Sequence, residues 1–314
     1  MRIAEAGRFV HAAGARTPRR YLETNLLSVH GRAKRLRAIA GAPRAQSQER
    51  DVEALEAVRV ASTLDVARNA EWLLLRDYDH SGRERNVIFL FRDDTPRAIV
   101  KVRARDGAGP SLRLECDALR AIAPLLDERL RRTIPRVEEY AVKGAHELLV
   151  LSALPGRSLS ILMQRSLRPR GAHITHLVAA AKWLGAFHRV THTAAHGDFW
   201  PSNILFRSAG EVSGVVDWEH ARVNGSRWHD VFLLPLLFTT DAPSWKPFDP
   251  AREFVRAFCT PYRGRNAVAD GIETYFRTYA REAGVDRGLL DVELANFLRA
   301  RDARLFDLYT RESE

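Results

Sequence analysis

The sequence predicts an α+β fold of two lobes: a small five-stranded antiparallel N-terminal lobe with one helix, and a larger helical C-terminal lobe. Short apolar segments rich in β-branched and aromatic residues recur between residues 71 and 154, separated by turn-like sequences. From residue 155 onward, segments with apolar residues at helical spacing dominate. The chain has 314 residues, which is enough for two lobes that each have a core.

The N-terminal lobe is expected to begin with a three-strand meander and to continue with a helix and two more strands. Its helix is predicted at 111–126, with Ser111 as the N-cap. The five strands are predicted at 71–78, 86–93, 97–104, 136–144 and 147–154.

The C-terminal lobe is expected to hold two short strands, "NILF" and "GVVDW", among helices at 173–191, at 228–238 and within 251–314. The domain boundaries expected from these patterns are a basic, mostly helical extension at 1–68, an N-terminal lobe at 69–154 and a C-terminal lobe at 155–314.

The net charge of +10 is concentrated near the N-terminus, where residues 1–50 hold eleven basic and three acidic residues. The run "RAKRLR" at 32–37 is expected to be a solvated helix face. The alternatives are docking on an acidic partner, attachment to an anionic membrane surface and packing beside the small lobe. Because the rest of the chain is nearly balanced, a nucleic-acid-binding fold is not expected.

The sequence favours a cytoplasmic protein, with peripheral membrane attachment through the basic segment as the alternative. It contains no run of 18 apolar residues and no recognisable secretory signal. Its two cysteines, Cys116 and Cys259, lack a CxxC spacing, and this favours a reducing compartment.

The stretch "AAHGDFWPSNILF" at 194–206 holds a His, an Asp and an Asn within eight positions, next to an apolar run. Asp198 and Asn203 are five positions apart with Pro201 between them, a spacing that suits a tight loop pointing both side chains at one place. Asp217 follows 14 residues after Asn203, at the end of an apolar strand. Two carboxylates and an amide oxygen form a hard-oxygen set that suits Mg²⁺.

A basic side chain, Lys101, stands inside the apolar strand "AIVKV". Such a lysine is costly unless it is paired, and Glu115 on the following helix is the expected partner.

These residues, taken together, resemble the aminoglycoside phosphotransferase and choline kinase group of the protein-kinase-like superfamily. The elements that carry the resemblance occur in the family's order over about residues 70–240. They are Lys101, Glu115, the hinge-like "LVLSALPGRSL", the helix end "LGAFH", the loop "HGDFWPSN" and "VVDWE".

The resemblance implies transfer of the ATP γ-phosphoryl group to an alcohol, with Mg²⁺ as cofactor. Asp198 would be the catalytic base, and Asn203 and Asp217 would hold the metal. Asp230, in "WHDV", matches a buried family aspartate that ties down the catalytic loop.

The resemblance also implies a nucleotide site. Lys101 would contact the α- and β-phosphates and Glu115 would position it, while the backbone of Ser152, Ala153 and Leu154 would face the adenine. The phosphate-covering loop should lie at 77–86, but this segment lacks the GxGxxG pattern. Ser81 and Gly82 are the candidates there, together with Arg83, and GTP is the alternative donor.

The acceptor is expected to be a small molecule, because the chain passes from Asp217 into a helix within about eleven residues, without a protein-kinase-like activation segment. Residues 251–314 hold eleven basic and eleven acidic residues, so a sugar, an amino alcohol or another metabolite is favoured over an aminoglycoside antibiotic. The alternatives are a nucleotide-binding pseudokinase and a protein or peptide kinase. The roles of Trp200 and Glu219 stay open.

Overall fold

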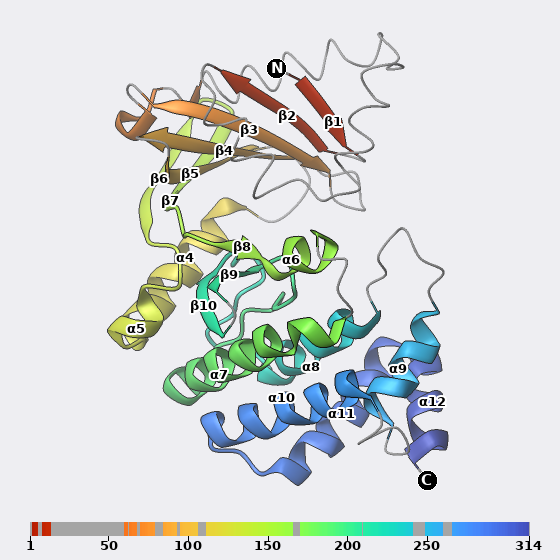
Figure 1. Cartoon of the computed structure of the whole chain (residues 1–314). Helices are drawn as coiled ribbons and strands as arrows, with labels where there is room; N and C mark the ends of the chain where they lie inside the picture. The colour runs from red at the N-terminus through yellow and green to blue at the C-terminus, as the bar shows by residue number, and fades with distance from the viewer. Residues whose placement is uncertain are drawn as a thin grey trace. The chain divides into compact units, whose positions relative to one another are not determined.

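The computed structural model describes most of the chain after residue 70 and a few segments before it. These residues are 2–5, 8–13, 60–61, 63–67, 70–78, 84–92, 95–105, 111–165, 170–208, 210–240, 249–259 and 266–313. An antiparallel sheet is followed by a largely helical part (Figure 1), and this confirms the predicted α+β class.

The chain divides into two compact units. The first comprises 1–120 and 135–153, and the second comprises 121–134 and 154–314. Residues 121–134 thus group with the helical unit, although the sequence pattern assigned them to the N-terminal lobe.

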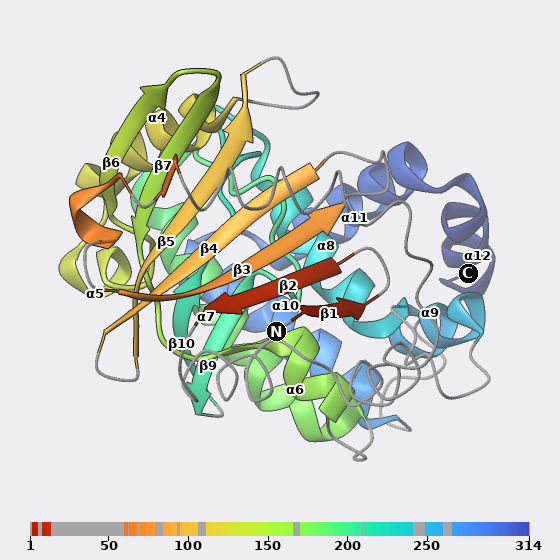
Figure 2. The ribbon, with the colours of Figure 1, turned by 90° about the horizontal axis from the view of Figure 1, so that it is seen from above.

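The first unit is built on a seven-stranded antiparallel sheet in the order β1-β2-β3-β4-β5-β7-β6 (Figure 2). Its strands are β1 (Arg2–Glu5), β2 (Arg8–Ala13), β3 (Glu71–Tyr78), β4 (Glu84–Arg92), β5 (Thr95–Ala104), β6 (Val137–Lys143) and β7 (His146–Ser152).

The five predicted strands are β3 to β7, and the structure adds β1 and β2 beside β3. It therefore differs from the mostly helical reading of residues 1–68 at 2–5 and 8–13, where the chain is extended. The physical reason is pairing: β2 runs antiparallel to β3 and satisfies the backbone groups that would be open at that edge. Residues 14–59, with the basic run, lie outside the described residues.

Successive side chains of β5 point to opposite faces of the sheet. Lys101 therefore lies on one face, and its neighbours Val100 and Val102 lie on the face that packs against the core. Ala98, Val100 and Val102 are buried and pack with apolar residues of β4 and β7. Residues 60–67 contribute Val60, Ala61 and Leu64 to this core.

A helix, α4 (Leu112–Ile122), follows β5 and is tied to β7 at its first turn. The Ser111 hydroxyl accepts a hydrogen bond from the Arg113 amide (3.1 Å) and donates one to Glu147 Oε2 (2.8 Å). Glu147 Oε2 also accepts from the Leu112 amide (2.9 Å). The predicted N-cap is confirmed, and a strand carboxylate supports it.

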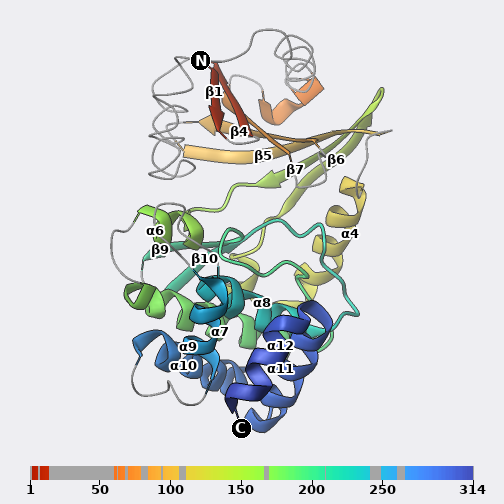
Figure 3. The same ribbon diagram turned by 90° about the vertical axis from the view of Figure 1, so that its right-hand side faces the viewer.

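The second unit joins a small sheet, ordered β10-β9-β8, to a set of helices. Figure 3 shows β9 and β10 of this sheet together with the helices. Its strands are β8 (Arg157–Ser158), β9 (Ile204–Ser208) and β10 (Glu211–Val215). Its helices are α5 (Glu128–Arg131), α6 (Leu159–Arg165), α7 (Ile174–Thr191), α8 (Arg227–Thr240), α9 (Pro250–Phe258), α10 (Ala267–Ala283), α11 (Arg287–Arg301) and α12 (Ala303–Ser313).

The long helices α7 and α10 approach closely at Gly185. A Cβ there would lie 2.6 Å from the Glu282 Cβ and 3.0 Å from the Tyr279 carbonyl oxygen, so only glycine fits. In the described part of the chain, every helix is too short or too polar to cross a bilayer.

Candidate active site

The loop between α7 and β9 is held at its start by a neighbouring segment. Ala195 and Arg222 exchange two backbone hydrogen bonds, of 2.8 and 2.9 Å. Gly197 has a φ of +81°, and a Cβ there would overlap the His220 carbonyl group. The segment after β10 thus packs directly on the loop that carries Asp198.

A buried carboxylate from α8 fixes the same loop. Asp230 is fully buried, and its two oxygens accept hydrogen bonds from the amides of His196 (2.6 Å) and Gly197 (2.8 Å). Carboxylate acceptors make such bonds stronger than neutral ones. The expectation that Asp230 ties down this loop is therefore confirmed.

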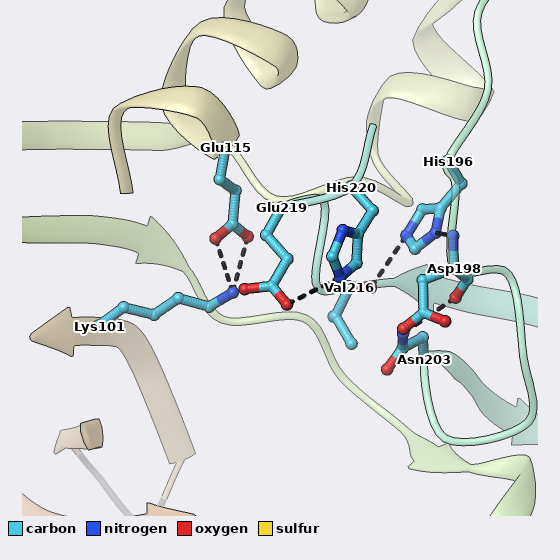
Figure 4. Close-up of polar contacts among 8 residues, drawn as sticks. All are labelled: Lys101, Glu115, His196, Asp198, Asn203, Val216, Glu219 and His220. Atoms are coloured by element: carbon cyan, nitrogen blue, oxygen red, sulfur yellow. Dashed lines mark hydrogen bonds and ion pairs between the residues drawn. The ribbon is translucent and has the colours of Figure 1, made fainter. Parts of the chain in front are cut away.

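His196 links the loop to the segment that holds Asp217 (Figure 4). Its Nδ1 accepts from the Asp198 amide (3.2 Å), and its Nε2 lies 3.1 Å from the Val216 carbonyl oxygen. Because a backbone amide can only donate, Nδ1 carries no proton and Nε2 donates to Val216. The ring is thus a neutral structural bridge between the backbones of Asp198 and Val216.

Asn203 orients the Asp198 side chain. Its Nδ2 donates to the Asp198 carbonyl oxygen and to Asp198 Oδ2, both at 3.0 Å (Figure 4). Two acceptors on one side fix the amide orientation. The amide oxygen then points away from Asp198, and it accepts no hydrogen bond from any described residue.

The pKa of Asp198 is raised above its ordinary value of 3.8, first by burial and second by the Asp217 carboxylate. His220, the Asn203 amide and His229 act in the opposite direction. Two carboxylates that repel each other in a partly buried place form a site that a divalent cation would stabilise.

The backbone at Asp217 is in the left-handed region, with a φ of +67°. Few residues other than glycine adopt this conformation, although aspartate tolerates it better than most. Strained backbone of this kind concentrates at functional sites.

The first unit contains the other predicted polar pair. Lys101 Nζ lies 2.8 and 2.7 Å from the two oxygens of Glu115, as Figure 4 shows. Glu115 is fully buried, and 16% of the Lys101 side chain is exposed. The expected partnership is present, and it compensates the buried charge of Glu115.

The predicted adenine-facing backbone is already partly hydrogen-bonded within the protein. The Ser152 amide donates to the Arg136 carbonyl oxygen (2.9 Å), and the Ala153 amide donates to the Arg97 carbonyl oxygen (3.1 Å). Among the three predicted residues, the Leu154 amide has no backbone acceptor in the described part of the chain. Ser81 and Gly82, like Arg83, lie outside the described residues.

The structure gives Glu219 a contact and leaves Trp200 with an open donor. Glu219 Oε1 lies 3.3 Å from His220 Nε2. The Trp200 indole nitrogen is buried and has no hydrogen-bond partner among the residues that the structure describes. The neighbouring Trp218 is a core residue: it is fully buried, and its indole donates to the Val215 carbonyl oxygen (2.9 Å).

The evenly spaced histidines before the loop have different surroundings. His188 is buried, with Nδ1 3.0 Å from the Tyr279 hydroxyl, and His192 follows α7 with a φ of +57°. Across the described residues, no group of three or more His, Cys, Asp or Glu side chains is placed to hold a metal ion.

Sequence reasoning missed His220 and His229, which both influence the charge of Asp198. The signal was present, because His220 lies just after "VVDWE" and His229 directly precedes Asp230. Only the folded chain brings both side chains near Asp198.

The antiparallel sheet followed by a largely helical part is consistent with a kinase-like fold. Residues 190–270, which contain the loop, Asp217 and Asp230, match the model of the phosphotransferase enzyme family. This match confirms, over that segment, the resemblance that the motifs indicated. A comparison with curated proteins found no match.

Proposed function

We propose that the protein is an ATP- and Mg²⁺-dependent O-phosphotransferase that acts on a hydroxyl of a sugar, an amino alcohol, an antibiotic or another metabolite. One observation carries the proposal. The Asp198 carboxylate is oriented by Asn203 and lies close enough to Asp217 for its pKa to rise, within the segment that matches the phosphotransferase family.

Asp198 is assigned the role of catalytic base. The acceptor oxygen forms a bond to the γ-phosphorus, the bond from that phosphorus to the β–γ bridging oxygen breaks, and ADP leaves. The hydroxyl proton passes to Asp198 and then to solvent. Phosphoryl transfer depends mainly on alignment and charge neutralisation, so a carboxylate held at a fixed angle suits it.

Asn203 and Asp217 are assigned to Mg²⁺. They fit the ion because both offer hard oxygen donors, and because the Asn203 amide is turned so that its oxygen is not used by Asp198. Bound Mg²⁺ would neutralise phosphate charge.

Lys101 is assigned to the α- and β-phosphates, with Glu115 holding its ammonium group in place. The Leu154 amide is assigned as the hydrogen-bond donor to adenine, because the amides of Ser152 and Ala153 already donate to backbone carbonyl oxygens. Ser81 and Gly82 remain candidates for the phosphate loop, and GTP remains the alternative donor.

The test is an Asp198→Ala variant of the full chain, assayed with Mg²⁺-ATP and hydroxylated acceptors. Loss of a general base should lower kcat about 10²–10⁴-fold. Nucleotide binding should persist, measured as thermal stabilisation by Mg²⁺-ATP. An unchanged kcat would contradict the role of Asp198. Stabilisation by nucleotide without turnover of any acceptor would instead support a pseudokinase.

A further inference from the structure

A histidine at the start of α8 lies beside the catalytic loop. His229 directly precedes Asp230, whose carboxylate holds the amides of His196 and Gly197, two residues and one residue before Asp198. The His229 ring is partly exposed and packs edge-to-face on Phe297 of α11, with centroids 5.7 Å apart. Its nitrogens have no hydrogen-bond partner among the described residues, so they can bind a ligand.

An arginine at the end of α11 reaches the same aromatic ring. The Arg301 guanidinium lies 5.9 Å from the centroid of Phe297, so Phe297 contacts both His229 and Arg301. Helix α11 packs against α8 (Figure 3), which explains the meeting of residues 72 positions apart.

Arg301 is exposed, and no carboxylate of the described residues lies within ion-pair distance of it. Another arginine of α11 behaves differently: Arg287 pairs with Glu273 (2.9 Å) and Asp291 (2.8 Å). Near its end, next to His229, α11 thus carries positive charge that is not paired with a described carboxylate.

A second histidine, His220, adds to this basic side of the loop. Its carbonyl group packs on Gly197, and its half-exposed ring lies 3.3 Å from Glu219. Glu219 balances His220, but neither it nor any other described carboxylate pairs with Arg301.

The electrostatic interactions support the same arrangement. His220 and His229 both lower the pKa of Asp198, against burial and Asp217. The pKa of His229 is lowered first by burial and further by Arg301 and His220, while Asp230 and Asp198 raise it. Arg301, His229 and Asp198 thus form a continuous set of interacting groups.

We propose, building on the proposed phosphotransferase function, that the acceptor carries an oxyanion, either a carboxylate or a phosphate, which Arg301 and His229 bind while its hydroxyl faces Asp198. Arginine suits this role, since its planar fork binds oxyanions in a bidentate manner. A polycationic acceptor such as an aminoglycoside would place ammonium groups against Arg301, an unfavourable like-charge contact. The oxyanion is unchanged in the reaction, and only the hydroxyl is phosphorylated.

The experiment compares acceptors that share hydroxyls and size but differ in charge. One series is glycerate, glycerol 3-phosphate, glycerol and 3-amino-1,2-propanediol, and the other is gluconate, glucose 6-phosphate, glucose and glucosamine. Turnover is measured with Mg²⁺-ATP, and binding is measured by ligand-observed NMR without nucleotide. The carboxylate and phosphate members should be preferred, and their ranking identifies which oxyanion is recognised.

The matched variants are Arg301→Ala and Arg299→Ala, both on exposed positions of α11. Loss of a charge-assisted contact should raise KM for the anionic acceptors about 10- to 100-fold with little change in kcat. The Arg299 guanidinium lies 4.6 Å from the centroid of the Phe306 ring instead of beside His229. Its removal should therefore leave KM unchanged.

The outcomes distinguish the oxyanion inference from the proposed phosphotransferase function. Turnover that favours neutral or cationic acceptors and ignores Arg301 would overturn the oxyanion inference and leave the phosphotransferase function standing. Arg301-dependent binding of anionic compounds without any turnover would support the inference and count against the function. Neither binding nor turnover of the anionic members would overturn the inference.

Discussion

At a single carboxylate, Asp198, the proposed catalytic role and the stability of the fold have opposite requirements. Burial and the neighbouring Asp217 raise its pKa, so the folded protein binds a proton there more tightly than the unfolded chain does. The stabilisation of the fold by this group is present in full at pH values below its ordinary pKa of 3.8. That contribution is lost as the pH rises through the raised value.

We therefore expect Asp198→Asn to raise the melting temperature at pH 7 while it abolishes phosphoryl transfer. The melting temperature should rise by about 2–4 °C for each kcal/mol by which the free energy of unfolding increases. It should shrink towards zero below pH 4, where the wild-type carboxyl is protonated. Thermal unfolding followed from pH 3 to 8 measures this.

The matched control is Asp307→Asn on α12, where the carboxylate is exposed. This change should leave the melting temperature within about a degree of the wild-type value at every pH, because substitutions of exposed residues usually have small effects on stability. A lower melting temperature for Asp198→Asn at pH 7 would show that the carboxylate stabilises the fold, contrary to its raised pKa.

Much of the candidate site was predictable at this scale. The spacing of Asp198, Asn203 and Asp217 indicated a shared loop and a strand end, and the pairing of Lys101 with Glu115 followed from the cost of a buried charge. The left-handed backbone of Asp217 was not predictable, because aspartate does not require this conformation.

At the scale of elements, a proline inside α8 changes how that helix is stabilised. Pro235 has no amide hydrogen, so the carbonyl of Val231, four residues earlier, lacks its usual helical donor. The Tyr275 hydroxyl of α10 donates to that carbonyl instead (3.0 Å). Tyr275 is fully buried and its pKa is raised by burial, which keeps it a neutral donor.

The expected result is that Tyr275→Phe destabilises the protein by about 1–3 kcal/mol, because it leaves the buried Val231 carbonyl unpaired. In a Pro235→Ala background the same change should cost less, since an amide hydrogen at position 235 can then donate to Val231. Urea unfolding of the four proteins gives this double-mutant cycle. Strictly additive costs would show that the two groups do not serve the same carbonyl.

The predicted helices and strands were confirmed where periodicity was strong, as for β3 and α7. β1 and β2 were missed, because they are short and their assignment depends on β3 offering an edge. Periodicity reports the burial pattern of one segment, whereas strand pairing requires a partner from elsewhere in the chain.

At the scale of the whole molecule, charge is distributed unevenly, with most of the excess in residues 1–50. The membrane reading of this segment stays a prediction. Deleting residues 1–50 would be a poor test, because β1 and β2 belong to the sheet and would be removed with it. Substitution of the basic run is therefore the better design.

We expect the full chain to bind phosphatidylserine vesicles at low salt and to release them as salt screens the charges. Changing Arg32, Lys34, Arg35 and Arg37 to Gln should weaken binding by about 1 kcal/mol per charge. A control of equal net charge changes four exposed arginines elsewhere: Arg189, Arg252, Arg299 and Arg304. Equal losses in both variants would point to total charge alone, and no binding at low salt would exclude the membrane reading.

The sequence by itself determined the α+β class, most of the elements and the residues of the loop that carries Asp198. It could do so because periodicity and motif spacing are local properties. Tertiary structure alone decided which backbone amides Asp230 binds, that Asp217 raises the pKa of Asp198, and that His229 and Arg301 meet at Phe297. These contacts join separate segments of the chain. They depend on the packing of the loop against α8 and against the segment after β10, and on the packing of α8 against α11.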